Sequence, residues 1–389
     1  MVLRLRCHHP VPLLLLALLS LTLSSLPFLT YAANRLVSGQ PLTLWQIAHS
    51  GLLWLPLALL WLLAVRRPTT ATPLLMLLLA QLLLAGMIFL SGQHAAALAQ
   101  QGSRLARTAF GSGLWLSAAL SLLLAAEAIR NLTRKALWRL LLNAQMWLLP
   151  LLMLLSGQLA QLSILKEYAN RPQIFEQAFS RHLMLLGGTL LPALLIGVPL
   201  GIWLYRRPRW QSGVFGVLNV IQTVPSVALF GLLIAPLAGL AQRFPTLGDW
   251  GIGGIGVAPA LIALVLYALL PLVRSVVAGL QQVPAEVCET ACGMGMGPLQ
   301  QFWHAEVPLA LPVWLAGLRV VVVQTLGMAV IAALIGAGGF GAIIFQGLLS
   351  SALDLVLLGV IPVVALAVIF DALFRLTISL LERHADDSF

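Results

Sequence analysis

Long apolar runs dominate this chain and restrict its fold more than any other feature. They are roughly 18 to 26 residues long, the length that a helix needs to cross a bilayer. They are rich in Leu and Ala and lack the alternation of polar and apolar residues found in membrane barrels. Only 9% of the residues are charged, against about 25% in soluble domains. The sequence therefore predicts an all-α polytopic membrane protein.

About ten transmembrane helices are expected. The first follows a basic N-terminal segment and is longer than the apolar core of a signal peptide, so we expect it to be retained, with processing as the open alternative. The expected spans are residues 11–31, 48–65, 72–91, 111–129, 138–156, 182–205, 214–237, 257–278, 313–337 and 354–381.

The polarity of the spans divides the chain into two halves. Residues 1–157 are expected to form an N-terminal five-span membrane region, residues 158–177 a polar periplasmic connecting segment, residues 178–382 a second five-span region, and residues 383–389 a cytoplasmic tail. Only the second region carries many polar residues and prolines within its spans, which lipid-exposed helices avoid. Its polar residues either line a pathway or hydrogen-bond neighbouring helices, and both readings stay open: Gln222, Thr223, Ser226, Gln324 and Thr325.

The basic residues indicate an orientation. With both termini in the cytoplasm, 15 of the 22 Lys and Arg residues fall on the cytoplasmic side and seven on the outer side, as the positive-inside rule requires. Because these residues are scattered at span ends and not clustered on one face, we exclude nucleic acid as a partner. Same-face ion pairs are expected for Glu127 with Arg130 and for Asp371 with Arg375; Arg319 either reaches the interface or pairs with Glu306.

Residues 284–312 form a polar interruption between two spans. A helix is predicted from Glu286 to Ala291, followed by a turn at Gly293, Gly295 and Gly297. A second short helix is predicted from Pro298 to Glu306, ending before Pro308 and Pro312. Such a helix–turn–helix segment outside the bilayer is predicted to be a binding surface for another protein.

This segment resembles the EAA loop of binding-protein-dependent ABC importer permeases of type I. Glu289-Thr290-Ala291 is followed after three residues by Gly295 and after nine more by Ala305-Glu306-Val307-Pro308. Thr290, Ala305 and Val307 depart from the family pattern without changing its spacing. Residues 220–237, 258–276 and 327–348 resemble the osmoprotectant branch of the family, and the N-terminal spans, with residues 36–39 and 102–108, resemble Yeh-type glycine betaine uptake permeases.

The resemblance implies a five-helix permease core in residues 178–382 and a place in the bacterial inner membrane. It implies import of glycine betaine or a related quaternary amine, with two copies of an ATPase subunit, a second permease of different sequence and a periplasmic substrate-binding protein as partners. Neither a cofactor nor a metal is expected. The residues expected to couple the permease to its ATPase are Glu289, Ala291, Gly295, Glu306 and Pro308.

A secondary transporter and an intramembrane enzyme are the two alternative classes of function. The sequence has no Gly-Lys dipeptide, and hence no Walker A loop with which to hydrolyse ATP itself. A secondary transporter driven by an ion gradient would carry inverted repeats and an acidic residue near the middle of a span. An intramembrane enzyme would carry paired carboxylates or a metal-binding motif. The sequence shows neither set of features.

Overall fold

The computed structural model describes residues 10–34, 37–67, 69–101, 105–246 and 252–386, with side chains as far as residue 382. Residues 1–9, which include Arg4 and Arg6, and much of the tail predicted at 383–389 lie outside this description. By their internal contacts the residues divide into an N-terminal unit, Met1–Asn170, and a C-terminal unit, Arg171–Phe389. The predicted boundaries at residues 157 and 178 bracket this division.

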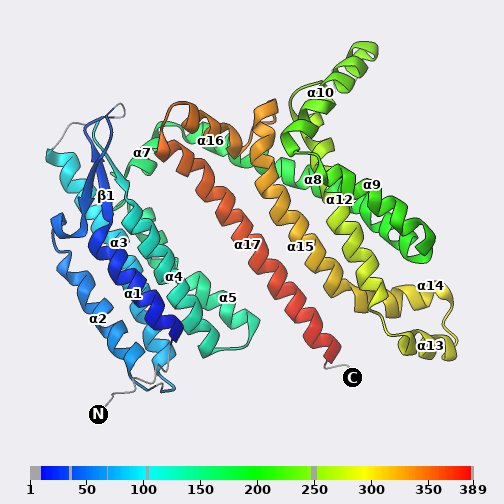
Figure 1. The fold of residues 1–389 in the computed structure, drawn as a ribbon, viewed down its shortest axis with the longest axis horizontal. Coiled ribbons are helices and arrows are strands. Elements are labelled where there is room, and N and C mark those ends of the chain that lie inside the picture. Colours follow the sequence, from blue (N-terminus) through cyan, green and yellow to red (C-terminus); the bar gives the residue numbers. More distant parts are fainter. Residues whose placement is uncertain (1–9, 35–36, 68, 102–104, 247–251, 387–389) are drawn as a thin grey trace. The chain divides into compact units, whose positions relative to one another are not determined.

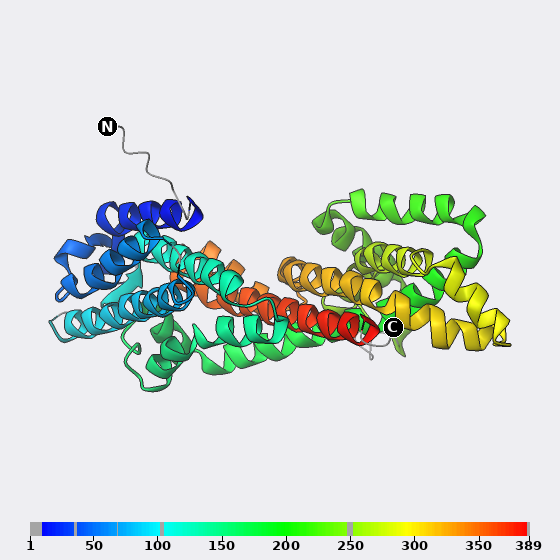
Figure 2. The same cartoon turned by 90° about the horizontal axis from the view of Figure 1, so that it is seen from below.

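Four helices of the N-terminal unit pack around one apolar core. In this ring α1 contacts α2 and α4, and α3 contacts the same two helices; Figure 2 shows the four lying alongside one another. Leucines such as Leu16, Leu60 and Leu77 are fully buried between them. The helices of this unit are α1 (Pro10–Ser25), α2 (Gly51–Val65), α3 (Thr72–Gln101), α4 (Ser112–Leu132), α5 (Ala136–Gln145), α6 (Leu148–Leu155) and α7 (Ser163–Asn170), with a short 3-10 turn at Leu44–Gln46.

A small antiparallel sheet closes one end of this unit, in the order β2 (Gln40–Thr43), β1 (Pro27–Ala32) and β3 (Arg107–Phe110). Thr30 lies opposite Pro41 on one side and Ala109 on the other. The sequence prediction missed this sheet and carried the first span through to residue 31. The helix instead ends at Ser25, because the residue before Pro27 is disfavoured in a helical conformation.

The C-terminal unit is built around α12, which packs against α8 and α15 along its length. α15 in turn packs against α17, and α13 and α14 lie together beyond the ends of α12 and α15 (Figure 1). The helices are α8 (Pro172–Arg206), α9 (Gln211–Thr223), α10 (Ser226–Arg243), α12 (Val257–Gln281), α13 (Ala285–Gly293), α14 (Pro298–Gln301), α15 (Val307–Ile331), α16 (Phe340–Leu349) and α17 (Leu353–Asp386), with short 3-10 turns at Pro208–Trp210 and Ala332–Ile335 and a π-helical segment, η3, at Phe302–Glu306.

The structure confirms the helical membrane class. Among the described residues, eight helical segments are long and apolar enough to cross a membrane. The first two expected spans correspond to shorter apolar helices, Pro10–Ser25 and Gly51–Val65, and α16 is a third short apolar helix that was not predicted.

Two of the expected spans are interrupted. The span predicted at 214–237 divides at Val224 and Pro225, which are extended (φ −67°, ψ 127° and φ −56°, ψ 137°). The span predicted at 138–156 divides at Met146 and Trp147, just before Pro150. Val224 directly precedes Pro225, which disfavours a helical conformation there, whereas Pro150 has no N–H to donate to the carbonyl of Met146, four residues earlier.

Candidate functional site

The candidate site is the segment that joins α12 to α15, residues 284–312. Its first helix, α13, ends in a Schellman motif: the N–H of Met296 donates to the carbonyl of Ala291 at 3.1 Å, and the N–H of Gly295 to that of Cys292 at 3.0 Å. Gly295 has φ +83°, a conformation that costs an L-residue about 1–2 kcal/mol. The predicted glycine turn is confirmed, and Gly295 is the residue whose backbone requires glycine.

The second helix of this segment does not end where the prolines predicted. α14 continues through the π-helical segment η3 into α15, so the prediction of an end before Pro308 and Pro312 is wrong. The N–H of Val307 bonds to the carbonyl of Phe302, five residues earlier, and Pro308 lies in the first turn of α15, where its missing N–H is tolerated. The π segment thus lets one helical path cross a proline.

Phe302 anchors the segment to the membrane helices. Its ring is buried in a cluster with Val276, Leu280 and Ala310, and the guanidinium of Arg206 lies 5.2 Å from the ring centroid. An arginine at this distance is attracted to the face of an aromatic ring. The base of the segment is therefore held by α8, α12 and α15 together.

Three of the predicted coupling residues differ in their surroundings. Glu289 is exposed on α13, whereas Ala291 is only 3% exposed and packs inward. Glu306 is half-buried and accepts a hydrogen bond from Gln301 Nε2 at 3.3 Å. Glu289 is consequently accessible from outside the chain, whereas Ala291 is enclosed and Glu306 is hydrogen-bonded within the segment.

Large apolar side chains also stand exposed on this segment, and sequence reasoning did not single them out. Met294, Leu299 and Trp303 are 67%, 69% and 59% exposed. Together with Glu286 and Glu289 they form what we call the loop surface. The signal was present in the sequence, since a Met, a Leu and a Trp in a polar loop have no membrane to face. Exposed apolar residues rimmed by charge are typical of protein interaction sites.

The polar residues within the spans lie in different environments. Gln222 donates from Nε2 to the carbonyl of Tyr267 at 3.0 Å, and Thr223 bonds to the Val220 carbonyl of its own helix. Thr325 is only 3% exposed. The bond to another helix supports the helix-packing alternative for Gln222, and burial supports it for Thr325, whereas Thr223 is exposed and both alternatives stay open for it. Ser226 and Gln324 are half-buried and stay candidates for a pathway lining.

Ion pairs tie several charged residues of the spans. Arg130 pairs with Glu127 and Arg375 with Asp371, each at 2.8 Å, and both sequence predictions are confirmed. Arg319 also pairs with Asp371, so the expected partner Glu306 is wrong. The partner lies 52 residues away on α17, a distance in sequence that only the packing of α15 on α17 can bridge.

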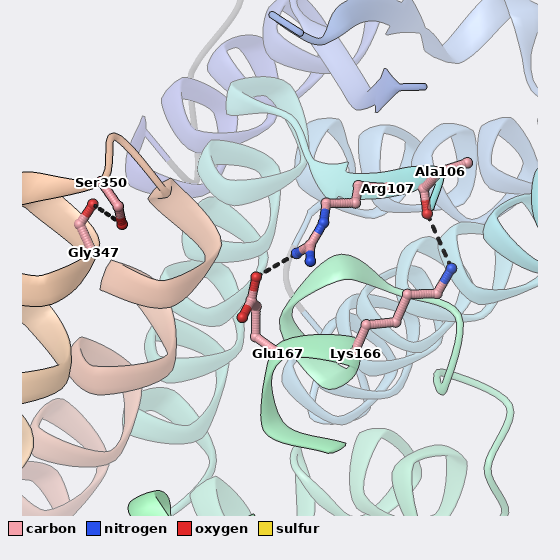
Figure 3. Close-up of polar contacts among 6 residues, drawn as sticks. All are labelled: Ala106, Arg107, Lys166, Glu167, Gly347 and Ser350. Carbon is pink, nitrogen blue, oxygen red and sulfur yellow. Dashed lines mark hydrogen bonds and ion pairs between the residues drawn. The ribbon is translucent and has the colours of Figure 1, made fainter. Parts of the chain in front are cut away.

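A buried ion pair braces α7 against the sheet of the N-terminal unit. Arg107 pairs with Glu167, whose side chain is only 2% exposed, and the neighbouring Lys166 donates from Nζ to the carbonyl of Ala106 at 3.1 Å (Figure 3). Burial, together with the nearby charge of Arg107, lowers the pKa of Lys166. The connecting segment of the chain is thus fixed to its own unit by charge as well as by apolar contacts.

Comparison with known proteins places these features in a family. Residues 193–382 match the family described as "Binding-protein-dependent transport system inner membrane component". Residues 7–165 match the family described as "ABC transporter permease YehY, N-terminal domain".

Two relatives and one solved structure are similar to parts of this chain. The osmoprotectant import permease protein OsmW of Salmonella typhimurium is 38% identical over 50% of this chain and 86% of its own length. The choline transport system permease protein OpuBB of Bacillus subtilis is 35% identical over 46% of this chain and 74% of its own length. A solved structure of the MetNI methionine ABC transporter is 19% identical over 54% of this chain and 96% of its own, with a TM-score of 0.47.

The relatives are similar to this chain over most of their own length. The apolar helices of the chain make it a multi-pass membrane protein, and its sequence carries no Walker A loop. The chain belongs to the family of binding-protein-dependent ABC importer permeases of the inner membrane, in which a separate ATPase subunit hydrolyses ATP and which associate with a partner permease.

Proposed function

We propose that this chain translocates glycine betaine or a related quaternary-amine osmoprotectant. The names of its relatives support this class of solute, since one imports osmoprotectants and another choline. A quaternary ammonium keeps its charge at every pH, so the solute has to cross as a cation or zwitterion within a protein-lined path. The alternative, a transporter driven by an ion gradient, would need a carboxylate to carry the ion, whereas Glu127 and Asp371 of the described spans are both paired with arginines.

The loop surface is the observation that carries the coupling part of the proposal. Glu286 and Glu289 are exposed on the same segment as the apolar Met294, Leu299 and Trp303, and this combination suits a groove in the ATPase that offers basic groups at its rim. Glu289 contacts the ATPase directly, whereas Ala291, Gly295, Glu306 and Pro308 present it. Movement of the ATPases then reaches α12 and α15, which carry the two ends of the segment.

The complete assembly contains two ATPase subunits, a second permease of different sequence and a periplasmic substrate-binding protein. Both termini of this chain lie in the cytoplasm, in agreement with the positive-inside rule, and the loop surface lies on the same side. The binding protein delivers solute at the outer side, and ATP binding and hydrolysis alternately open the pathway outward and inward.

The test combines a strained substitution with a matched control. Gly295→Val places a β-branched residue at φ +83°, where such residues are strongly disfavoured. Gly297→Val, two residues on, has φ −68° and ψ 162° and ample space. Uptake of labelled glycine betaine and co-purification of the ATPase are measured at equal membrane expression. We expect Gly295→Val to lose most of both and Gly297→Val to retain them. Wild-type uptake by Gly295→Val would contradict the coupling role.

The solute is tested separately. Proteoliposomes with the complete transporter are given labelled glycine betaine, choline or an unrelated amino acid. ATP-dependent accumulation of the two quaternary amines alone supports the proposal, and accumulation of the amino acid alone contradicts it.

A further inference from the structure

Two backbone carbonyls of the C-terminal unit lack a helical donor, one because of a proline in α12 and the other because the backbone between α9 and α10 is extended. Pro271 lies inside α12 and has no N–H, so the carbonyl of Tyr267, four residues earlier, loses its helical hydrogen bond. The carbonyl of Val224 lies in the gap between α9 and α10, next to Pro225. Within a membrane a carbonyl without a donor is costly, because no water is available to replace it.

Each carbonyl is satisfied by a side chain from the other element. Gln222 on α9 donates from Nε2 to the carbonyl of Tyr267 at 3.0 Å. The hydroxyl of Tyr267 donates to the carbonyl of Val224. Tyr267 is only 5% exposed and packs in a cluster with Leu229 and Phe230 of α10. We call these two reciprocal hydrogen bonds the Gln222–Tyr267 interlock.

One residue of the interlock, Tyr267, lies on α12, the helix that precedes the loop surface in the chain. Only residues 282–284 separate the end of α12 from the start of α13, so a displacement of α13 moves α12. On the other side of the interlock, α10 makes few contacts within its unit, since it buries only Leu229, Phe230 and Leu237 among its side chains. A firmly packed helix is thus joined by polar contacts to a lightly packed one at a backbone break.

We propose that Gln222 and Tyr267 are positioning residues through which α12 moves the α9–α10 break when the ATPase moves α13. The inference rests on the proposed coupling function and adds the route by which coupling reaches a second helix. The break supplies a bend that needs no further loss of helical hydrogen bonds, and the interlock makes α10 follow α12.

The experiment uses the complete transporter in proteoliposomes and measures the solute imported per ATP hydrolysed. Gln222→Leu and Tyr267→Phe each remove one of the two hydrogen bonds. We expect the ratio to fall about 3- to 10-fold in each variant, as the loss of one such contact allows, while the ATPase still co-purifies. An unchanged ratio in both variants would overturn the proposal.

A matched control lies in the N-terminal unit. Gln81 donates from Nε2 to the carbonyl of Gln145 at 3.1 Å, beside the break between α5 and α6. Gln81→Leu therefore removes the same kind of contact, from a side chain to a freed carbonyl, away from α12. We expect it to leave the ratio of solute to ATP unchanged; a fall as large as that of Gln222→Leu would show that the ratio follows any loss of this kind and would overturn the proposal.

A double variant distinguishes two roles of Gln222: passing movement from α12 to α9, and merely donating a hydrogen bond to the carbonyl of Tyr267. In Gln222→Leu with Pro271→Ala, the new N–H at residue 271 can bond to the carbonyl of Tyr267, so that carbonyl is satisfied again without any link to α9. If the interlock transmits movement, the ratio stays low in the double variant. Recovery of the wild-type ratio would show that Gln222 only satisfies a carbonyl. Loss of ATPase binding by the intact chain would instead contradict the proposed function itself.

Discussion

Gly317 lies where α15 closely approaches α12, and adding one methyl group there tests the packing of the C-terminal unit. An ideal Cβ on Gly317 would lie 2.1 Å from both Cβ and Oγ of Ser275 on α12. A separation of 3.4 Å is where ordinary contact begins, so the two helices have to part by about 1.3 Å (3.4 − 2.1) in Gly317→Ala.

The magnitude follows from comparison with a second glycine on the same helix. A Cβ on Gly327 meets nothing within 4 Å, and Gly→Ala raises helix propensity by about 1 kcal/mol at either site. The difference between the two variants is therefore the overpacking cost alone, about 1–3 kcal/mol. For a unit of this size 1 kcal/mol shifts Tm by about 2–4 °C, which predicts a Tm for Gly317→Ala about 2–12 °C below that of Gly327→Ala.

The assay is thermal unfolding of the purified variants in detergent, followed by tryptophan fluorescence and by the fraction that stays monodisperse after heating. Gly317→Ala combined with Ser275→Gly should recover most of the loss, because the second change removes the atoms that clash. Equal Tm values for Gly317→Ala and Gly327→Ala would refute the close approach of the two helices.

Two further predictions concern charged groups. Asp371→Asn leaves Arg319 and Arg375 without their carboxylate and should lower the free energy of unfolding by about 1–3 kcal/mol, measured as Tm in detergent; an unchanged Tm would contradict the role of both pairs. The lowered pKa of Lys166 makes its charged form destabilising below that pKa, and this effect fades as pH rises toward the unfolded value of about 10.4. The Tm of Lys166→Met minus that of wild type should therefore fall as pH rises through the lowered pKa of Lys166 toward about 10.4, and a rise of that difference would refute the assignment.

Local features of the sequence were sufficient to predict the membrane class and the turn of the loop surface. Run length and composition specify helices that cross a bilayer, because lipid offers the backbone no other donors. The glycine at 295 could be predicted because a helix end followed by a reversal commonly needs a residue with positive φ. Ion pairs at i, i+3 and i, i+4 were predictable for the same reason, since both partners lie on one helix.

Contacts between distant segments could not be predicted in this way. The partner of Arg319 depends on how α15 packs on α17, and the sequence offered Glu306 as an equally reasonable choice. A proline inside an apolar run, such as Pro271, predicts that the carbonyl four residues earlier has no helical donor. The sequence does not predict that the side chain of Gln222 donates to that carbonyl. The sheet was missed because its strands are short and two of them adjoin long helices.

The π-helical segment η3 has a consequence for the direction in which the loop surface points. Each residue of an α-helix turns the chain by about 100°, and the hydrogen bond from Val307 to Phe302 spans one residue more than an α-helical turn. Everything before Phe302 is therefore rotated relative to the course of an unbroken α-helix. The π-helical segment therefore sets the angle about the helix axis between α15 and the loop surface. Inserting or deleting one residue in η3 would rotate Leu299 and its neighbours about that axis while their own sequence stayed the same.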